Sequence, residues 1–317
     1  MFAVPDIVNF HINVTVIDVH GRAESGKGKG VLLDILPNFW QEFFTVLSIG
    51  EVERVPHIRH DLQKREWQAI ARVILYGYKM VQYFPLNLSQ LFITSCLFGE
   101  ESLNREFLLR SFRLHVAGDD REVLGMCLSK DFNATDEDVL EFLSMWKCYK
   151  VPTQENIESI IFELAHKELV QRPRYVVNCW LPILKSLQHD PAFQTPEAVT
   201  ELYERKRPSA KKINKLFRAD ISNDAERQSM DHLKRYVKSL EGKALERFLH
   251  FVTGSNVISC GFINIVFTSL DGLQRRPVVH TCGPTLELPT TYECYTDLTE
   301  EFTNIMREDQ AWSFDIV

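Results

Sequence analysis

The order of apolar and polar residues in the first two thirds of the chain predicts mainly helices. In residues 12–19 the two kinds alternate, as in a strand with one buried face. Between 61 and 84 the apolar residues recur at helical spacing, and Pro85 is expected to end this helix. Further helices are expected at 136–146, 154–170 and 174–188, and another from Thr195.

Prolines and polar caps are expected to set the limits of several helices. Pro37, in "VLLDILPNFWQEFF", marks a helix start or break, because proline lacks the N–H that an inner helical turn uses. Thr135 is expected to cap the helix that follows it, with Asp138 in the capping-box position. Pro208 divides the basic stretch 205–218, which we interpret as a solvated helix face beside a linker. A nuclear-localisation or anion-contact patch is the alternative.

The last hundred residues have a different pattern, with strands among the helices. A helix at 242–252 has its apolar residues on one face, and Gly254 is expected to stop it. The run "FINIVF" predicts a buried strand, and "PVVHT" predicts a second one. A final helix is expected at 296–307.

This change of pattern predicts an α+β fold of two lobes. Residues 1–215 are expected to form a larger, mostly helical lobe, and residues 216–317 a smaller α/β lobe. The polar stretch "ADISNDAERQ" marks the boundary, and we expect a hinge through residues 208–222.

Composition and charge narrow the class of protein. An apolar fraction of 45% with 25% charged residues is typical of a globular chain that buries its own core. The formal net charge of −7 argues against nucleic acid as the main partner. The longest apolar window contains Arg72 and Lys79, so no membrane span is expected. Pro5, Asp6 and His11 interrupt any signal peptide. We therefore expect an intracellular protein, cytoplasmic with a nuclear location also open.

The cysteines indicate free thiols. They are odd in number, seven in all, and none forms a CxxC pair. This usage is typical of a reducing compartment and argues against a disulfide framework or a structural zinc site. Four of them stand in apolar runs that predict helices and are expected to be small buried hydrophobes: Cys96, Cys127, Cys148 and Cys179.

The glycine-rich stretch "GRAESGKGKG" nearly spells a phosphate-binding loop. Gly21, Gly26 and Lys27 fit the P-loop pattern, but Gly28 stands where a hydroxyl should hold Mg²⁺. The sequence also offers no recognisable carboxylate for the metal. We interpret the glycines as a strand-to-helix turn that requires positive φ and close packing. No nucleotide, metal or other cofactor is expected.

Between Leu245 and Tyr295 five short phrases follow one another: "FL", "FVTGS", "GF", "HTC" and "LELP". In order and interval they resemble the C-terminal lobe of HECT-type E3 ubiquitin ligases, and the first hundred residues resemble the larger lobe loosely. The resemblance implies that Cys282 of "HTC" accepts ubiquitin from an E2 ubiquitin-conjugating enzyme as a thioester, and then passes it to a lysine of a protein substrate.

The resemblance also implies supporting residues. His280 either stabilises the thiolate or merely packs, and Thr281 either orients the thioester or favours the strand. Phe314, fourth from the end of the sequence, corresponds to a phenylalanine that positions the thioester in the family. Its alternative is a frayed apolar end.

Two hypotheses of different class remain open. One is a working ligase, which the intact "HTC" and Phe314 favour. The other is a catalytically inactive scaffold that binds ubiquitin, an E2 or another protein, because residues 100–190 contain no motif that matches the E2-docking subdomain. An exposed aromatic groove in 100–190 would favour the ligase, and burial of Cys282 would favour the scaffold.

Two other uses of Cys282 fit the sequence less well. With His280 it would supply half a metal site, but no other ligands stand at a recognisable spacing. A papain-like protease places its nucleophile at the start of a helix, whereas Cys282 precedes Pro284 in an expected turn.

Overall fold

The computed structural model describes residues 2–10, 12, 14 and 28–307, and the chain divides into two compact units. The predicted lobes 1–215 and 216–317, and the hinge between them, stay predictions. In the described ranges no helix combines the length and the apolar character needed to cross a membrane. The first unit comprises Met1–Val8, Trp40–Leu75 and Pro85–Glu204, and the second comprises Asn9–Phe39, Tyr76–Phe84 and Arg205–Val317.

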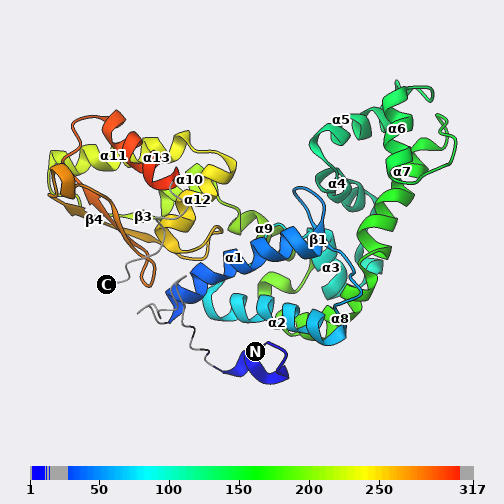
Figure 1. The fold of residues 1–317 in the computed structure, drawn as a ribbon, viewed down its shortest axis with the longest axis horizontal. Helices are drawn as coiled ribbons and strands as arrows, with labels where there is room; N and C mark the ends of the chain where they lie inside the picture. The colour runs from blue at the N-terminus through cyan, green and yellow to red at the C-terminus, as the bar shows by residue number, and fades with distance from the viewer. Residues whose placement is uncertain (1, 11, 13, 15–27, 308–317) are drawn as a thin grey trace. The chain divides into compact units, whose positions relative to one another are not determined.

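The fold is α+β, as predicted, and the first unit is mainly helical (Figure 1). The predicted helices at 154–170 and 174–188 are confirmed, each continued by a shorter helical turn. Besides parts of α1 (Lys29–Leu47), α2 (Lys64–Val81) and α9 (Pro196–Lys206), this unit contains α3 (Gln90–Phe98), α4 (Arg105–His115), α5 (Gly118–Cys127), α6 (Glu137–Met145), α7 (Ile157–His166), α8 (Arg174–Leu184) and the antiparallel strands β1 (Ser48–Ile49) and β2 (Val55–Pro56).

Two helix limits differ from the prediction because packing and backbone geometry outweigh the proline signals. Pro37 neither starts nor breaks a helix but lies inside α1. Its neighbours Leu36 and Trp40 are 3% and 1% exposed, and their burial offsets the backbone hydrogen bond that proline removes. The helix α2 ends at Val81, before Pro85, because Gln82 turns the chain with a φ of +56°.

The cap of α6 is also one residue later than predicted. Asp136, not Thr135, is the N-cap: its Oδ1 accepts hydrogen bonds from the backbone N–H groups of Asp138 and Val139, at 3.0 and 3.4 Å. The Thr135 hydroxyl donates instead to Asn133. An aspartate caps as well as a threonine, so the sequence alone left the choice open.

A buried polar cluster lies in the core of the first unit. Glu53 and His115 are 5% and 3% exposed, and the carboxylate of Glu53 accepts a hydrogen bond of 2.7 Å from Ser89. The His115 Nδ1 lies 3.2 Å from the Glu53 carbonyl oxygen. Burial lowers the pKa of His115 to about 4 and raises the pKa of Glu53.

We expect acid to destabilise the first unit through His115. Between pH 6.5 and 4 the unfolded chain takes up a proton that the folded chain does not, so the free energy of unfolding falls as the pH falls. The expected loss between pH 6.5 and 4.5 is about 2 kcal/mol. Urea titrations followed by tryptophan fluorescence measure it, because the Trp146 ring lies 6.2 Å from the His115 ring.

The control for this prediction is His115→Gln, which keeps a polar side chain but cannot take up the proton. Glu53 has a raised pKa and so acts in the opposite sense, losing stability as the pH rises. The difference between the wild type and His115→Gln isolates the histidine. Equal pH dependence in the two proteins would show that His115 is not the group responsible.

The second unit contains a four-stranded mixed sheet. The strand order is β3-β4-β6-β5; β4 is parallel to β3 and β6, and β5 is antiparallel to β6. The predicted strands are confirmed as β4 and β5, but β4 is buried on one face only, since Ile265 is 3% and Val266 42% exposed. The bounds are β3 (Phe217–Arg218), β4 (Ile263–Thr268), β5 (Val278–His280) and β6 (Thr285–Pro289).

Helices cover the buried face of this sheet and form the core with it (Figure 1). Phe248, Leu286 and Phe302 are each fully buried there. The helix α12 ends as predicted, because Gly254 adopts the left-handed conformation at φ +74°. The helices are α10 (Ala210–Leu216), α11 (Asp224–Ser239), α12 (Gly242–Thr253) and α13 (Tyr295–Arg307).

One basic residue of the stretch 205–218 is not on a solvated face. Lys206 is 4% exposed, and its ammonium group donates to the carbonyl oxygens of Gln82 and Ile258. It also lies 5.5 Å from the centre of the Tyr78 ring. These contacts compensate for the burial of its charge. Lys206 therefore holds the beginning of the basic stretch against the segments that contain Gln82 and Ile258.

Candidate functional site

Cys282 lies in a four-residue turn between the antiparallel strands β5 and β6. The pairing of His280 with Thr285 closes the turn, and the Thr285 hydroxyl donates to the Gly283 carbonyl oxygen at 2.7 Å. The Cys282 side chain is exposed. The turn therefore presents this thiol to solvent in a defined direction, in the position that the sequence predicted.

The other cysteines are less suited to accept an acyl group. Burial raises the pKa of four thiols, that of Cys127 to about 11, and so disfavours the nucleophilic thiolate. Cys148 does not lie in a helix, as the apolar run suggested, but in the partly exposed segment after α6. Cys294 is exposed, and its sulfur lies 3.2 Å from Asp297 Oδ1. The four thiols with a raised pKa are those of the buried Cys96, Cys127 and Cys179 and of the partly buried Cys260.

The residues beside Cys282 have distinct surroundings. His280 is at the end of β5, where its Nε2 lies 2.9 Å from Glu287 Oε1 on the neighbouring strand. Thr281 is 7% exposed. Phe314 lies outside the described residues. The structure thus brings His280, Thr281 and Cys282 together at one end of the sheet, with the His280 ring engaged by a carboxylate.

The first turns of α1 contact the cysteine turn. Gly30 is buried, and a Cβ atom built on it would lie 2.7 Å from Cys282 Sγ. Gly254, at the end of α12, lies so close that its Cβ would be 3.5 Å from the Cβ atoms of both Leu33 and Thr281. The three elements α1, α12 and the cysteine turn therefore meet at one point.

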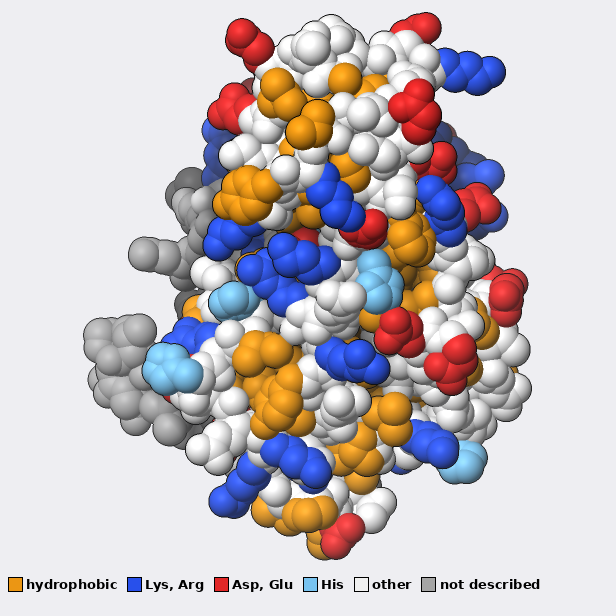
Figure 2. Space-filling model, turned by 90° about the vertical axis from the view of Figure 1, so that its right-hand side faces the viewer, with side chains coloured by type: hydrophobic (Ala, Val, Ile, Leu, Met, Phe, Trp, Pro, Cys, Tyr) orange, Lys and Arg blue, Asp and Glu red, His pale blue; other side chains and the backbone are white. Residues whose placement is uncertain are grey.

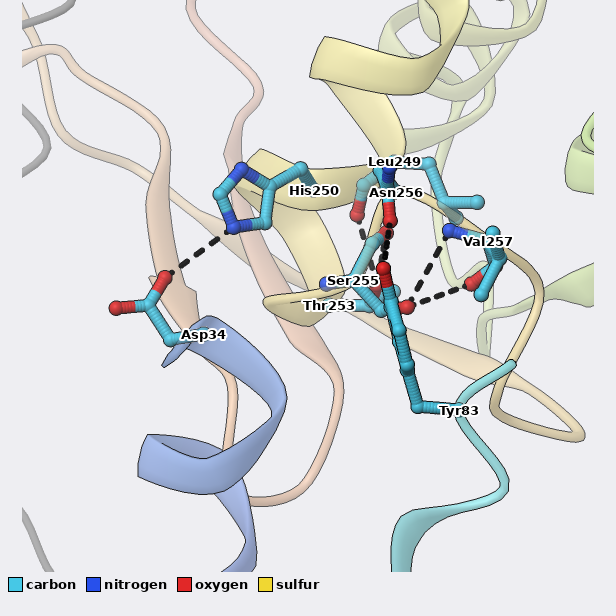
Figure 3. A network of polar contacts seen from close by, with 8 residues as sticks. All are labelled: Asp34, Tyr83, Leu249, His250, Thr253, Ser255, Asn256 and Val257. Carbon is cyan, nitrogen blue, oxygen red and sulfur yellow. Dashed lines mark hydrogen bonds and ion pairs between the residues drawn. The ribbon is translucent and has the colours of Figure 1, made fainter. Parts of the chain in front are cut away.

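Polar contacts join α12 and the loop after it to α1 and to the segment after α2 (Figure 3). Asp34 Oδ1 of α1 lies 3.2 Å from His250 Nε2 of α12. The Tyr83 hydroxyl donates to Asn256 Oδ1 at 3.2 Å, and burial raises the pKa of this phenol. The Ser255 hydroxyl shapes the loop after α12 by donating to the Val257 carbonyl oxygen at 2.9 Å. Sequence patterns indicated neither the Asp34–His250 pair nor the Tyr83–Asn256 pair, because the members of each are far apart in the chain.

Part of the glycine-rich stretch can be compared with its interpretation. Gly28 has a φ of +98° and Gly30 is closely packed, as expected for a turn that leads into a helix. Gly21, Gly26 and Lys27 lie outside the described residues. Where the chain is described, no three His, Cys, Asp or Glu side chains are grouped to hold a metal ion.

A groove of about 620 Å³ opens on the first unit, within the range 100–190. Tyr149 and Phe162 line it, and Tyr149 is 84% exposed. Two further apolar side chains of the same segment are exposed, Met145 at 58% and Val151 at 78%. Figure 2 shows exposed hydrophobic side chains among charged ones at the end of this unit that carries α5–α7.

Comparison with known proteins identifies a family for the end of the chain. Residues 198–315 match the family model of the HECT domain, described as ubiquitin-transferase. The matched range includes Cys282 and the whole mixed sheet. No curated protein matches the chain.

Proposed function

Because residues 198–315 match the HECT family model, we propose that the protein is an E3 ubiquitin-protein ligase in which Cys282 accepts ubiquitin from an E2 and passes it to a substrate lysine. The observation that carries this proposal is the exposed Cys282 thiol, held in a turn inside the matched range. A scaffold role would be favoured by a buried thiol, and Cys282 is exposed.

The proposed reaction has two acyl transfers. First, the Cys282 thiolate attacks the carbonyl carbon of the ubiquitin–E2 thioester; a C–S bond to Cys282 forms, the C–S bond to the E2 breaks, and the E2 thiolate takes up the proton that Cys282 released. Then a neutral lysine amine attacks the new thioester, the amide forms, and the departing Cys282 thiolate takes up the amine proton. The first step exchanges one thioester for another, so it needs little driving force, and a thiolate is a strong nucleophile for it.

We propose the groove beside Tyr149 as the E2-docking surface. Exposed tyrosine and methionine side chains in a concave surface are typical of interface centres; Tyr149 lines this groove, and Met145 lines a second hollow that shares Lys147 with it. The groove also has charged residues at its margin, among them Lys147, Lys150 and Glu163, which suit a polar interface rim. An exposed aromatic groove in residues 100–190 is the feature expected of a working ligase, so this surface supports that hypothesis.

The test of the proposed function is direct. The purified chain is mixed with ubiquitin-charged E2 enzymes and run on a gel without reductant. An adduct of chain plus ubiquitin that dithiothreitol removes is the expected result. Absence of any adduct across a broad E2 panel, with folding verified by circular dichroism, would overturn the ligase and leave the inactive scaffold.

Replacement of Tyr149 is expected to weaken E2 docking. Tyr149→Ala removes an 84% exposed ring from the groove without opening the core, so the melting temperature should stay unchanged. At subsaturating charged E2, adduct formation should slow about 10-fold or more, as for an aromatic interface anchor. At saturating charged E2 the rate should recover, because the Cys282 turn is untouched.

Tyr175→Ala is the matched control, since Tyr175 is 42% exposed in the same unit and does not line the groove. It should load ubiquitin at the wild-type rate. A wild-type rate for Tyr149→Ala at every E2 concentration would place E2 docking elsewhere, and a loss that saturation cannot restore would point to a role in the chemistry instead.

A further inference from the structure

Residue 30 can lie this close to Cys282 only because glycine has no side chain. A Cβ at position 30 would lie 2.7 Å from Cys282 Sγ and 3.0 and 3.1 Å from the Cys282 backbone nitrogen and Cα. Such distances are shorter than normal nonbonded contacts between heavy atoms. Any side chain at position 30 would therefore displace both the thiol and the backbone of the turn.

The helix itself gives no reason for a glycine at this position. Gly30 lies inside α1 and is not among the glycines with positive φ, so its backbone conformation suits any residue. Gly30 is the second residue of α1, and glycine is less favourable in helices than alanine, by about 1 kcal/mol at an interior position. The close approach of Cys282 is the feature that requires it.

Two neighbouring positions of α1 strengthen the contact. Leu33 and Asp34 lie on the same helix face as Gly30, because residues three and four apart share a face. Leu33 reaches the end of α12 at Gly254, and Asp34 pairs with His250 (Figure 3). We call Gly30, Leu33 and Asp34 the α1 seat. It holds the cysteine turn directly and holds α12 beside it.

We propose that the α1 seat positions Cys282, with Gly30 as the positioning residue: it covers one side of the sulfur and leaves the other side open to the ubiquitin thioester. The claim that the seat directs ubiquitin transfer rests on the proposed ligase function. The claim that the seat covers one side of the Cys282 sulfur does not depend on that function. The acyl carbon must bond to Sγ from the open side, so the seat fixes the direction of attack.

A side chain at position 30 should have opposite effects on two reactions of Cys282. Displacing the turn uncovers the sulfur, so alkylation by a small reagent with no binding site should become faster, by about 2-fold or more. Transfer from the E2 requires a fixed direction, and misplacement by about 1 Å costs up to roughly 100-fold in such reactions. A purely structural role of Gly30 would not move the two rates in opposite directions.

The experiment uses the full chain and three variants. Gly30→Ala adds the Cβ to a helix position where alanine is otherwise favourable. Asp34→Ala removes the carboxylate that contacts His250 and adds no bulk. Gly261→Ala is the matched control, since Gly261 is exposed and a Cβ there would meet nothing within 4 Å. The rate of iodoacetamide alkylation is measured for each cysteine by mass spectrometry, and adduct formation is measured at saturating charged E2.

The seat is supported if Gly30→Ala raises alkylation of Cys282 alone and slows adduct formation about 10-fold or more, while Gly261→Ala changes neither. It is overturned if Gly30→Ala leaves the Cys282 alkylation rate at the wild-type value. If Gly30→Ala unfolds the second unit, shown by loss of far-UV circular dichroism signal and of hydrogen-exchange protection in α12 and α13, then Asp34→Ala decides: faster Cys282 alkylation supports the seat and an unchanged rate overturns it.

The two proposals fail in distinguishable ways. If Gly30→Ala is alkylated faster at Cys282 but even the wild type forms no ubiquitin adduct, the ligase proposal is rejected and the proposal that Gly30 covers the Cys282 sulfur is retained. If the wild type and Gly30→Ala have equal Cys282 alkylation rates and equal adduct formation, the proposal of the α1 seat is rejected and the ligase proposal is retained.

Discussion

Alanine in place of Cys282 is expected to abolish the thiol-sensitive ubiquitin adduct completely. In the proposed mechanism the acyl group is attached to Cys282, and desolvation raises the pKa of four of the other thiols, which disfavours their nucleophilic form. Fold and stability should be unaffected, since the Cys282 side chain is exposed in a turn. The measurement is adduct formation on a gel without reductant, with circular dichroism as the check of folding.

Two further variants sharpen this prediction. Cys282→Ser should give a slower adduct that withstands dithiothreitol but not alkali, because the bond is then an oxygen ester. Cys294→Ala is the matched control, since Cys294 is the other exposed cysteine among the described residues, and it should load normally. An adduct that survives Cys282→Ala and disappears in Cys294→Ala would move the acceptor site to Cys294.

The parts of the site that the sequence predicted are those with local signals. The helix end at Gly254 follows from a left-handed conformation that glycine adopts most readily. The turn at Cys282 follows from an apolar strand before it and Gly283 and Pro284 after it. Each of these features depends on residues close together in the chain, so a short stretch of sequence contains the whole signal.

The surroundings of Cys282 depend on residues distant in sequence and could not be predicted in this way. Gly30 meets Cys282, and Asp34 meets His250, only after the second unit has folded. No period of apolar residues encodes such contacts. The glycine-rich stretch did predict close packing, but it gave no indication that Cys282 is the residue against which Gly30 packs.

Other features were not predicted because their sequence patterns are short or contain conflicting residues. The strand β3 has two residues, too few for alternation to be seen, and β6 coincides with the phrase "LELP", whose proline disfavours a strand. The groove beside Tyr149 could not be predicted from the sequence for a similar reason. Tyr149 and Val151 are exposed apolar residues in a segment without regular structure. Exposure of apolar side chains outside helices and strands leaves no periodic pattern.

Removal of the Phe302 ring is expected to destabilise the second unit by about 3–5 kcal/mol. Phe302 of α13 is fully buried, and its ring centre lies 5.3 Å from that of Tyr236 on α11 and 6.0 Å from that of Phe248 on α12. Phe302→Ala therefore leaves a cavity where three helices meet beneath the sheet that holds Cys282. The described tryptophans all lie in the first unit, so hydrogen exchange of α13 and far-UV circular dichroism in urea are the suitable measurements.

Asn304→Ala is the control for this cavity, because Asn304 is exposed on the same helix and its replacement should change the free energy of unfolding by less than about 0.5 kcal/mol. Phe302 does not belong to the cysteine turn, so Phe302→Ala should still form the ubiquitin adduct at temperatures where it is folded. Its loss of activity on heating should coincide with its lower melting temperature. A loss of loading in fully folded Phe302→Ala would mean that the packing of α13 directs the Cys282 turn as well as stabilising it.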